Sequence, residues 1–322
     1  MKTDKSLQKG LIILGMHRSG TSALSGALSE LGCFVGKDLF QAQKGVNEKG
    51  FFENSKTVAL NEKLFKQMRS DWDDPLGFLR DLDPCFNQKN IEHATKFIRK
   101  EYGKHILWGM KDPRTSILLP FWNAAFEKTN MVCKSIIMVR DPFEVAGSLA
   151  KRDKFSLEKS LILWLSYTLA SIKYTDQQDR LVVLYDDLIS DPEKTLSLIT
   201  KTFVPELNDK AKHAASFIDA KLRHHKKPAS EEEISSDLIK LSKRLYNLLS
   251  SENFDEQDVK DIEQKYTDYL ESLKGVLSEH LDQVKKSELQ ARKLFSEAYH
   301  SYWWKLSWPL RAAERIIRPN RD

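Results

Sequence analysis

The stretch LGMHRSGTSAL, residues 14–24, follows a short apolar run and precedes a segment with helical periodicity. Gly15 and Gly20 bracket four residues, as in the nucleotide-binding pattern GxxxxGK[ST], but Thr21 stands where that pattern has lysine. Backbone N–H groups of such a turn still hold a phosphate, and Arg18 supplies positive charge in place of the lysine. Since the missing lysine is the group that bridges the β- and γ-phosphates of a triphosphate, the stretch predicts a P-loop-type turn that holds a single phosphate.

The same stretch has a simpler interpretation. A tight turn between a strand and a helix, capped by a serine or threonine, needs no ligand and uses the same residue types. Loose loop patterns also match by accident. A second anion site in the same sheet would favour the phosphate interpretation.

The stretch MVRDPFEVAGSLAKRD, residues 138–153, predicts such a second site. Arg140 stands at the end of an apolar run, and a helix that starts near Pro142 would place Ser148 and Arg152 four residues apart on one face. Side chains so arranged can share one anion. The alternative is a solvated arginine beside an incidental helical serine.

Apolar runs rich in β-branched residues alternate with amphipathic segments through the first two thirds of the chain. The runs are LIIL (11–14), ILWGM (106–110), SIIMV (135–139) and LVVLY (181–185), and each is followed by a polar turn and a helical pattern. Buried parallel strands with crossover helices give this alternation. We therefore predict an α/β fold, with a P-loop-type parallel sheet flanked by helices.

The character of the sequence changes after Pro228. From about residue 230 to 300 the chain is charged and contains little Gly or Pro, while apolar residues recur at helical spacing. This predicts a C-terminal helical appendage, arranged as a helical hairpin or a short coiled coil. The predicted domains are 1–228 and 229–322. The apolar positions are Leu238, Leu241, Leu245, Leu248, Ile262, Tyr266, Leu270, Leu273, Leu277 and Leu281.

Composition and charge narrow the possible partners. With 51 basic and 46 acidic residues the formal net charge is +5, a slight excess that favours an anionic ligand or a membrane surface over nucleic acid. The three cysteines have no CxxC spacing and cannot all pair, which predicts a reducing compartment. The charged start MKTDKSLQKG meets only the short apolar run LIIL, so we expect a cytoplasmic protein.

Together the two anion motifs resemble those of the sulfotransferases that use 3′-phosphoadenosine 5′-phosphosulfate. GMHRSGTS resembles their 5′-phosphosulfate loop, and RDPFEVAGS resembles their 3′-phosphate motif, with the same interval from Arg to Ser. The resemblance covers about residues 1–225. Three further stretches, GFFEN (50–54), KDPRT (111–115) and LYDDL (184–188), resemble the branch that contains the tyrosylprotein and bacterial glycan sulfotransferases. The donor-binding residues that the resemblance implies are Gly15, His17, Arg18, Ser19, Gly20, Thr21, Ser22, Arg140, Ser148, Arg152 and Tyr185.

The resemblance also implies catalytic roles for Glu53, Lys111 and Arg18. Glu53 would be the general base that takes the proton of an acceptor alcohol, and Lys111 would face the transferring sulfuryl oxygens. A sulfuryl group carries one negative charge and leaves a stable phosphate, so we expect no metal. The alternatives are an acidic residue near a helix start for Glu53 and an ion pair with Asp112 or another loop acid for Lys111.

The sequence offers three further candidates. Tyr185 is expected at the end of a strand, near the nucleotide or simply in the core. The basic stretch RHHKK (223–227) would close over phosphates or form a solvated loop. His17 is the alternative base, because the histidine base of cytosolic sulfotransferases has no clear match here. Their C-terminal glycine-rich nucleotide loop is also missing, which argues against a small-phenol or steroid acceptor.

The tail YHSYWWKLSWPLRAAERIIR, residues 299–318, combines clustered aromatic residues with arginines. Such a segment is typical of a helix in a membrane interface, which would make the protein peripheral at the inner face of the membrane. The alternative is an aromatic plug that docks the helical appendage, whose helices would also serve for homo-oligomer formation.

The predicted activity is transfer of a sulfuryl group to a hydroxyl of a glycan, either a bacterial cell-surface polysaccharide or its lipid-linked precursor. Two rival functions stay open. A kinase of the same fold would need Mg²⁺ and a grip on a triphosphate that Thr21 does not offer. A nucleotide-binding scaffold would bind without turnover.

Overall fold

The computed structural model describes residues 8–42, 50–175, 179–218, 236–251 and 254–301. The chain divides into two compact units, residues 1–267 and 268–322. The strands are β1 (Lys9–Leu14), β2 (Leu107–Lys111), β3 (Val132–Val139) and β4 (Arg180–Leu184). The helices are α1 (Thr21–Glu30), α2 (Ser55–Gln67), α3 (Gln88–Tyr102), α4 (Thr115–Glu127), α5 (Pro142–Asp153), α6 (Leu157–Lys173), α7 (Tyr185–Ser190), α8 (Pro192–Phe203), α9 (Ala211–Ala215), α10 (Asp237–Leu249) and α11 (Glu256–His300), with short 3-10 turns η1 (Gly77–Leu79), η2 (Asp83–Cys85) and η4 (Pro205–Lys210).

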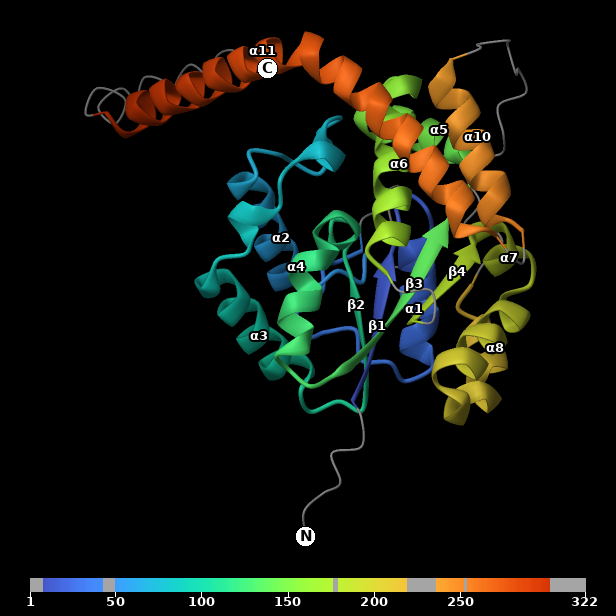
Figure 1. Cartoon of the computed structure of the whole chain (residues 1–322). Coiled ribbons are helices and arrows are strands. Elements are labelled where there is room, and N and C mark those ends of the chain that lie inside the picture. The colour runs from blue at the N-terminus through green and yellow to red at the C-terminus, as the bar shows by residue number, and fades with distance from the viewer. Residues whose placement is uncertain (1–7, 43–49, 176–178, 219–235, 252–253, 302–322) are drawn as a thin grey trace, which may run out of the picture. The chain divides into compact units, whose positions relative to one another are not determined.

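The four strands form one parallel sheet in the order β2-β1-β3-β4 (Figure 1). In the register of β1 with its neighbours, Ile13 lies opposite Lys111 and Leu14 lies opposite Ile137. The carboxyl ends of the strands therefore meet at one edge, and the turns that follow them lie together. The predicted α/β fold with a parallel sheet is confirmed.

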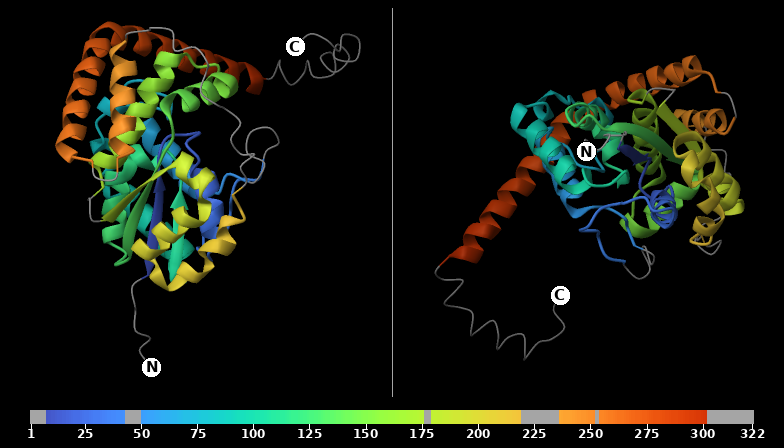
Figure 2. Two further views of the ribbon diagram at one scale, coloured as in Figure 1. Left: turned by 90° about the vertical axis from the view of Figure 1, so that its right-hand side faces the viewer. Right: turned by 90° about the horizontal axis from the view of Figure 1, so that it is seen from below.

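Helices cover both faces of the sheet (Figure 2). Leu11 and Ile13 of β1 pack with Leu24 and Leu28 of α1 and with Leu196 of α8. On the other face, α6 contacts β3 and α4. Since both faces are covered, the strands read as continuous apolar runs.

Local capping explains where several helices begin. Asp141 accepts hydrogen bonds from the N–H groups of Phe143 and Glu144, and Pro142 follows it as the first residue of α5. Proline is favoured there because the first helical N–H has no partner within the helix. The prediction of a helix that starts near Pro142 is confirmed.

Two helices expected in the C-terminal appendage are present in the described residues. In α10, Leu238, Leu241 and Leu245 are buried, and α10 packs on α6. Early in α11, the Tyr266 hydroxyl donates to the Ile162 carbonyl oxygen at 2.7 Å and lies 2.7 Å from Ser166 Oγ. These parts of the appendage belong to the first unit. The predicted boundary at residues 228/229 lies outside the described residues.

The second unit is described from Asp268 to Ser301 and consists of the remainder of α11. Leu289, Leu294, Phe295 and Tyr299 are exposed there. Within the described ranges, no helix is both long and apolar enough to cross a membrane.

Candidate active site

The phosphate-loop stretch forms a tight turn between β1 and α1. Gly15 and Gly20 have φ values of 131° and 92°, and a side-chain Cβ would lie 2.4 Å from the Met138 carbonyl oxygen at Gly15 and 2.3 Å from the Tyr185 ring at Gly20. Arg18 takes the left-handed conformation too, with φ of 70°. Gly20 caps α1 with no side-chain hydrogen bond, and the first turn of α1 carries no acid. The serine or threonine cap of the ligand-free interpretation is therefore absent, and the N-terminus of α1 presents its N–H groups with the polarity that suits an anion.

Lys111 joins three predicted motifs at the carboxyl edge of the sheet. It ends β2, its side chain is only 3% exposed, and its Nζ lies 2.5 Å from Glu53 Oε1. The same Nζ donates to Ser22 Oγ at 3.1 Å and to the Phe51 carbonyl oxygen at 3.0 Å. The loop helix, the GFFEN segment and the end of β2 therefore meet at one ammonium group.

Glu53 is not part of a helix, so the alternative of an acidic residue at a helix start does not hold. Helix α2 begins at Ser55, and Asn54 caps it by accepting from the Lys56 N–H at 2.9 Å. The first turn of α2 holds no acidic residue. Because Glu53 precedes the cap, its carboxylate is not held at the helix N-terminus and pairs with Lys111 instead.

The 3′-phosphate motif and the loop are bonded to each other. Arg18 Nε donates to Ser148 Oγ at 2.8 Å, and Arg140 Nη1 donates to the Arg18 carbonyl oxygen at 3.2 Å. The Arg140 guanidinium lies 4.3 Å from the centre of the Tyr185 ring and 2.9 Å from Glu144 Oε2. These contacts bring the two predicted anion sites into one cluster.

The sequence predicts Tyr185 at the end of a strand, but it is the first residue of α7 and follows the end of β4. Its side chain is buried in the core cluster that includes α1 and α8, with Arg140 over its ring. The core interpretation of Tyr185 therefore holds, and the ring also limits where the Arg140 guanidinium can lie.

Arg152 extends the cationic cluster toward an aromatic group. Its Nε donates to Asp153 Oδ2 at 2.7 Å, and its guanidinium lies 5.5 Å from the centre of the Trp72 ring. Burial and then the charges of Arg152 and Arg140 lower the pKa of Arg18. The three guanidinium groups are thus close enough to repel one another, which favours binding of an anion between them.

His17 lies close to four cationic side chains. Its Nε2 is buried and has no hydrogen-bond partner. Burial, followed by the charges of Arg114, Arg152, Lys111 and Arg18, lowers the pKa of the imidazole well below its ordinary value. His17 is therefore neutral at pH 7.

A hydrogen-bond network that the sequence did not predict supports the turn after Lys111. The fully buried Asp112 accepts from Asn61 Nδ2 at 3.0 Å and from the N–H of Arg114 at 3.0 Å. Asn61 Oδ1 in turn accepts from Trp122 Nε1 at 2.8 Å. An Asn in α2 has no local feature that marks it as a partner of a turn about fifty residues later, so only the fold reveals it.

Asn61→Leu is expected to destabilise the protein by about 3 kcal/mol, since it removes a donor from a buried carboxylate and leaves the Trp122 N–H unpaired. Urea denaturation measures the change. Asn123→Leu, at an exposed position of α4, is the matched control and is expected to cost less than about 0.5 kcal/mol. A loss below about 1 kcal/mol for Asn61→Leu would contradict a stabilising role for the network.

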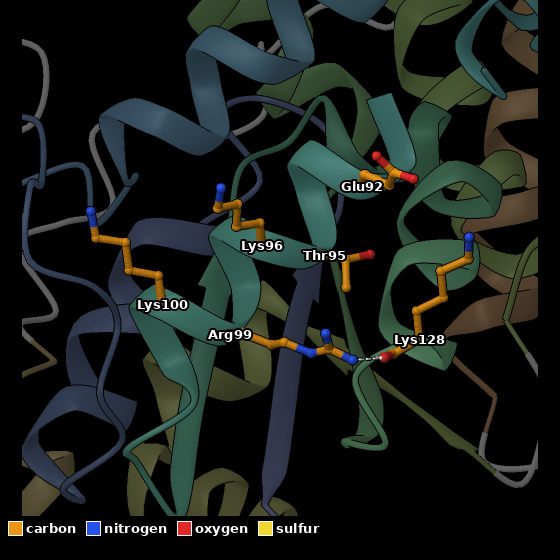
Figure 3. Close-up of a pocket in the computed structure, with 6 residues that line it drawn as sticks. All are labelled: Glu92, Thr95, Lys96, Arg99, Lys100 and Lys128. Atoms are coloured by element: carbon orange, nitrogen blue, oxygen red, sulfur yellow. Dashed lines mark hydrogen bonds between the residues drawn. The ribbon is translucent and has the colours of Figure 1, made fainter. Parts of the chain in front are cut away.

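A basic surface pocket lies away from these residues. Figure 3 shows the Arg99 guanidinium directed at the carbonyl oxygen of Lys128, to which it donates a hydrogen bond. Lys128 follows α4, and the next strand, β3, starts at Val132, so the pocket lies toward the amino ends of the strands. It is therefore separate from the phosphate loop. Its lining residues are Glu92, Thr95, Lys96, Arg99, Lys100 and Lys128.

Two predicted features fall wholly or mostly outside the described residues. RHHKK (223–227) does so completely, and the aromatic and basic tail does so from residue 302 onward. In the ranges that the structure covers, no three His, Cys, Asp or Glu side chains gather as a metal-binding group.

No family model and no curated protein matches the chain. Among solved structures, the chain is similar to the sulfotransferase domain of the Synechococcus PCC 7002 olefin synthase, with 15% identity, a TM-score of 0.41, and coverage of 83% of this chain and 98% of that one. A sulfotransferase from Mycobacterium tuberculosis H37Rv shows 15% identity and a TM-score of 0.40, over 66% of this chain and 71% of that one. The sulfotransferase domain from the curacin biosynthetic pathway shows 15% identity and a TM-score of 0.36, over 81% and 99% of the two chains.

Proposed function

We propose that this protein is a sulfotransferase that moves a sulfuryl group from 3′-phosphoadenosine 5′-phosphosulfate to a hydroxyl of a glycan. The observation that carries the proposal is the meeting of Glu53, Lys111 and Ser22 beside the phosphate loop. A carboxylate and an ammonium group stand there next to a helix N-terminus suited to an anion. Base, charge stabilisation and anion site are the parts that transfer to an alcohol requires.

The residues present fit the donor nucleotide. Ser19 Oγ is buried without a partner, and Gly20 leaves the N-terminus of α1 uncapped by any side chain. Buried polar groups without partners are costly, and a phosphate oxygen would accept the Ser19 hydroxyl. Arg18, Ser148 and Arg140 form the second group of donors, at the position that the sequence resemblance implies for the 3′-phosphate.

The donor supplies a sulfuryl group on a phosphate leaving group. Glu53 takes the proton of the acceptor hydroxyl, and the carboxylate is held for this by its contact with Lys111 Nζ at 2.5 Å. Lys111 neutralises negative charge at the site of transfer, and Ser22 and the Phe51 carbonyl oxygen fix the direction of its ammonium group. Arg18 adds a second positive charge from the loop.

A glycan is proposed as acceptor on the basis of the sequence. The stretches GFFEN, KDPRT and LYDDL resemble the branch with glycan and tyrosylprotein acceptors, and the glycine-rich loop of the cytosolic branch is missing. A cell-surface polysaccharide or its lipid-linked precursor is the first choice. The proposal includes a cytoplasmic location, peripheral contact with the membrane through residues 299–318, and self-association through the C-terminal helices.

The nucleotide preference tests the proposed function. We expect adenosine 3′,5′-bisphosphate to bind in the presence of a chelator and to raise the melting temperature, whereas ATP with Mg²⁺ does not. Arg18→Ala is expected to weaken the binding of the bisphosphate. Stabilisation by ATP with Mg²⁺ alone would favour the kinase. Bisphosphate binding without transfer of label to any lysate glycan, read by mass spectrometry, would favour the scaffold.

Arg140→Ala is expected to weaken the binding of adenosine 3′,5′-bisphosphate by about 2 kcal/mol or more, roughly thirtyfold in affinity. The reason is that charge-assisted hydrogen bonds to phosphate are strong. Affinity for adenosine 5′-phosphate, which lacks the 3′-phosphate, is expected to change little. Titration calorimetry measures both.

The substitution also removes the Arg140 guanidinium from its contact with the buried Glu144 carboxylate. The comparison is therefore repeated in a Glu144→Gln background, where that charge is absent. Equal losses for the two nucleotides in both backgrounds would show that Arg140 does not hold the 3′-phosphate.

A further inference from the structure

A pair of half-buried aromatic residues, Trp72 and Phe155, lies beside the phosphate loop. The Trp72 ring lies 4.6 Å from the His17 ring and 5.8 Å from the Phe155 ring, the latter at an interplanar angle of 30°. Trp72 and Phe155 are both half-buried, whereas Trp108, Trp122 and Trp164 are fully buried. Among the tryptophans that the structure describes, Trp72 is therefore the one that is not fully buried, and its ring contacts the loop residue His17.

The segment that carries Trp72 is held in place by helix α6. The Tyr167 hydroxyl donates to the Trp72 carbonyl oxygen at 2.8 Å, and Lys159 Nζ lies 2.7 Å from Asp73 Oδ2. The Trp72 N–H also donates to Asp71 Oδ1 at 2.7 Å. A ring fixed in this way loses little conformational entropy when a ligand stacks on it.

His17, whose ring contacts the Trp72 ring, has a polar atom without a hydrogen-bond partner. His17 Nε2 is buried without a partner, although buried ring nitrogens are normally hydrogen-bonded. The imidazole is neutral, because burial and the four cationic side chains around it lower its pKa. A neutral imidazole nitrogen pairs with a hydroxyl whether it carries the proton or the lone pair, since a hydroxyl both donates and accepts.

A sugar ring matches this combination. Its C–H face is apolar and packs on an aromatic ring, while its edge carries hydroxyls for His17 and for the Arg152 guanidinium 5.5 Å from the Trp72 ring. A purely apolar ligand would leave His17 Nε2 unpaired. A small ion would make no use of the apolar parts of the two rings, of which Phe155 also has Lys159 Nζ 3.8 Å from its centre.

We propose that Trp72, Phe155 and His17 form the acceptor-sugar subsite, in which a sugar ring lies on Trp72 and one of its hydroxyls bonds His17 Nε2. The proposal rests on the proposed function for its acceptor class. Trp72 and Phe155 bind the acceptor in it, and neither takes part in the transfer.

Oligosaccharide binding to the full chain, saturated with adenosine 3′,5′-bisphosphate, tests the proposal. The probes are tetragalacturonate and cellotetraose at millimolar concentration, and ligand-observed NMR gives their affinities. In protein labelled with 5-fluorotryptophan, the resonance that is missing from Trp72→Phe belongs to Trp72. We expect at least one probe to shift that resonance, and we expect Trp72→Ala to lower the affinity for this probe at least tenfold. His17→Phe keeps a ring beside Trp72 and is also expected to weaken it.

Phe86→Ala is the matched control, because Phe86 is an aromatic residue that is 41% exposed in another part of the fold. It is expected to leave oligosaccharide affinity unchanged, and the Trp72 and Phe86 variants are expected to bind the bisphosphate as the unsubstituted protein does. The subsite would be overturned if the probes bound Trp72→Ala as tightly as the unsubstituted protein, or if neither probe bound the unsubstituted protein. Bisphosphate binding would still uphold the proposed function in either case. Failure of the bisphosphate itself to bind would instead count against the proposed function.

Discussion

Glu53→Gln is expected to lower the rate of sulfate transfer by about 10²- to 10⁴-fold, the range in which a general base contributes. The amide has nearly the shape of the carboxylate but cannot accept the acceptor's proton. Affinity for adenosine 3′,5′-bisphosphate should stay within about twofold, since the anion-binding groups are on the loop and on α5. Transfer of label from the donor to a lysate glycan fraction measures the rate, and calorimetry measures the affinity.

Glu62→Gln is the matched control. Glu62 also faces an arginine near the site, at 3.6 Å from Arg114 Nη2, but its side chain is 48% exposed. It is expected to leave the transfer rate within about threefold of the original. A Glu53→Gln protein with a near-normal rate would remove the base assignment and direct attention to the neutral imidazole of His17.

Lys111→Met is expected to lower the transfer rate by about 10²- to 10³-fold, as removal of one preorganised donor from a site of developing charge does. Methionine fills most of the buried volume but carries no charge. Lys56→Met, which removes an exposed lysine paired with Asp38, is the control for loss of charge alone. A Lys111→Met protein that transfers sulfate as fast as Lys56→Met would show that Lys111 serves only the ion pair.

The double variant Glu53→Gln/Lys111→Met separates two explanations for such losses. If the two side chains act as one unit, the double variant should be little slower than the slower single variant. Losses that multiply would show independent roles. Melting temperatures of all three proteins check that the folded state persists.

Local sequence was enough to predict the phosphate turn, the strands and the start of α5. Gly15 and Gly20 stand where the backbone has positive φ, and Pro142 stands where a helix begins with a proline-compatible residue. Each of these features depends on residues within one turn of the chain, so a short pattern contains the necessary information.

The boundaries of two elements were less well predicted. One interpretation of the sequence placed Glu53 at the start of a helix, but Asn54 caps α2 and leaves Glu53 outside it. It placed Tyr185 in the strand, but the chain turns into α7 one residue earlier. In both cases a contact distant in sequence accompanies the shift, with Lys111 in the first and with Arg140 in the second.

Several residues around the site carried no local pattern at all. Asn61, Trp72 and Tyr167 lie on different segments, and nothing near them in the sequence distinguishes them from ordinary core or surface residues. Arg114 belongs to a motif that the sequence did mark, KDPRT, but its proximity to His17 comes from the fold.

The sequence by itself determined the α/β class, the parallel sheet and the residue types of the two predicted anion motifs, because periodicity, glycine spacing and residue type are local properties. Only the tertiary structure decided which side chains meet. Lys111 reaches Glu53 across 58 residues, and Arg18 reaches Ser148 across 130 residues. Parallel strands place the turns after their carboxyl ends side by side whatever their separation along the chain, and burial then selects the pairs that satisfy one another's charges and hydrogen bonds.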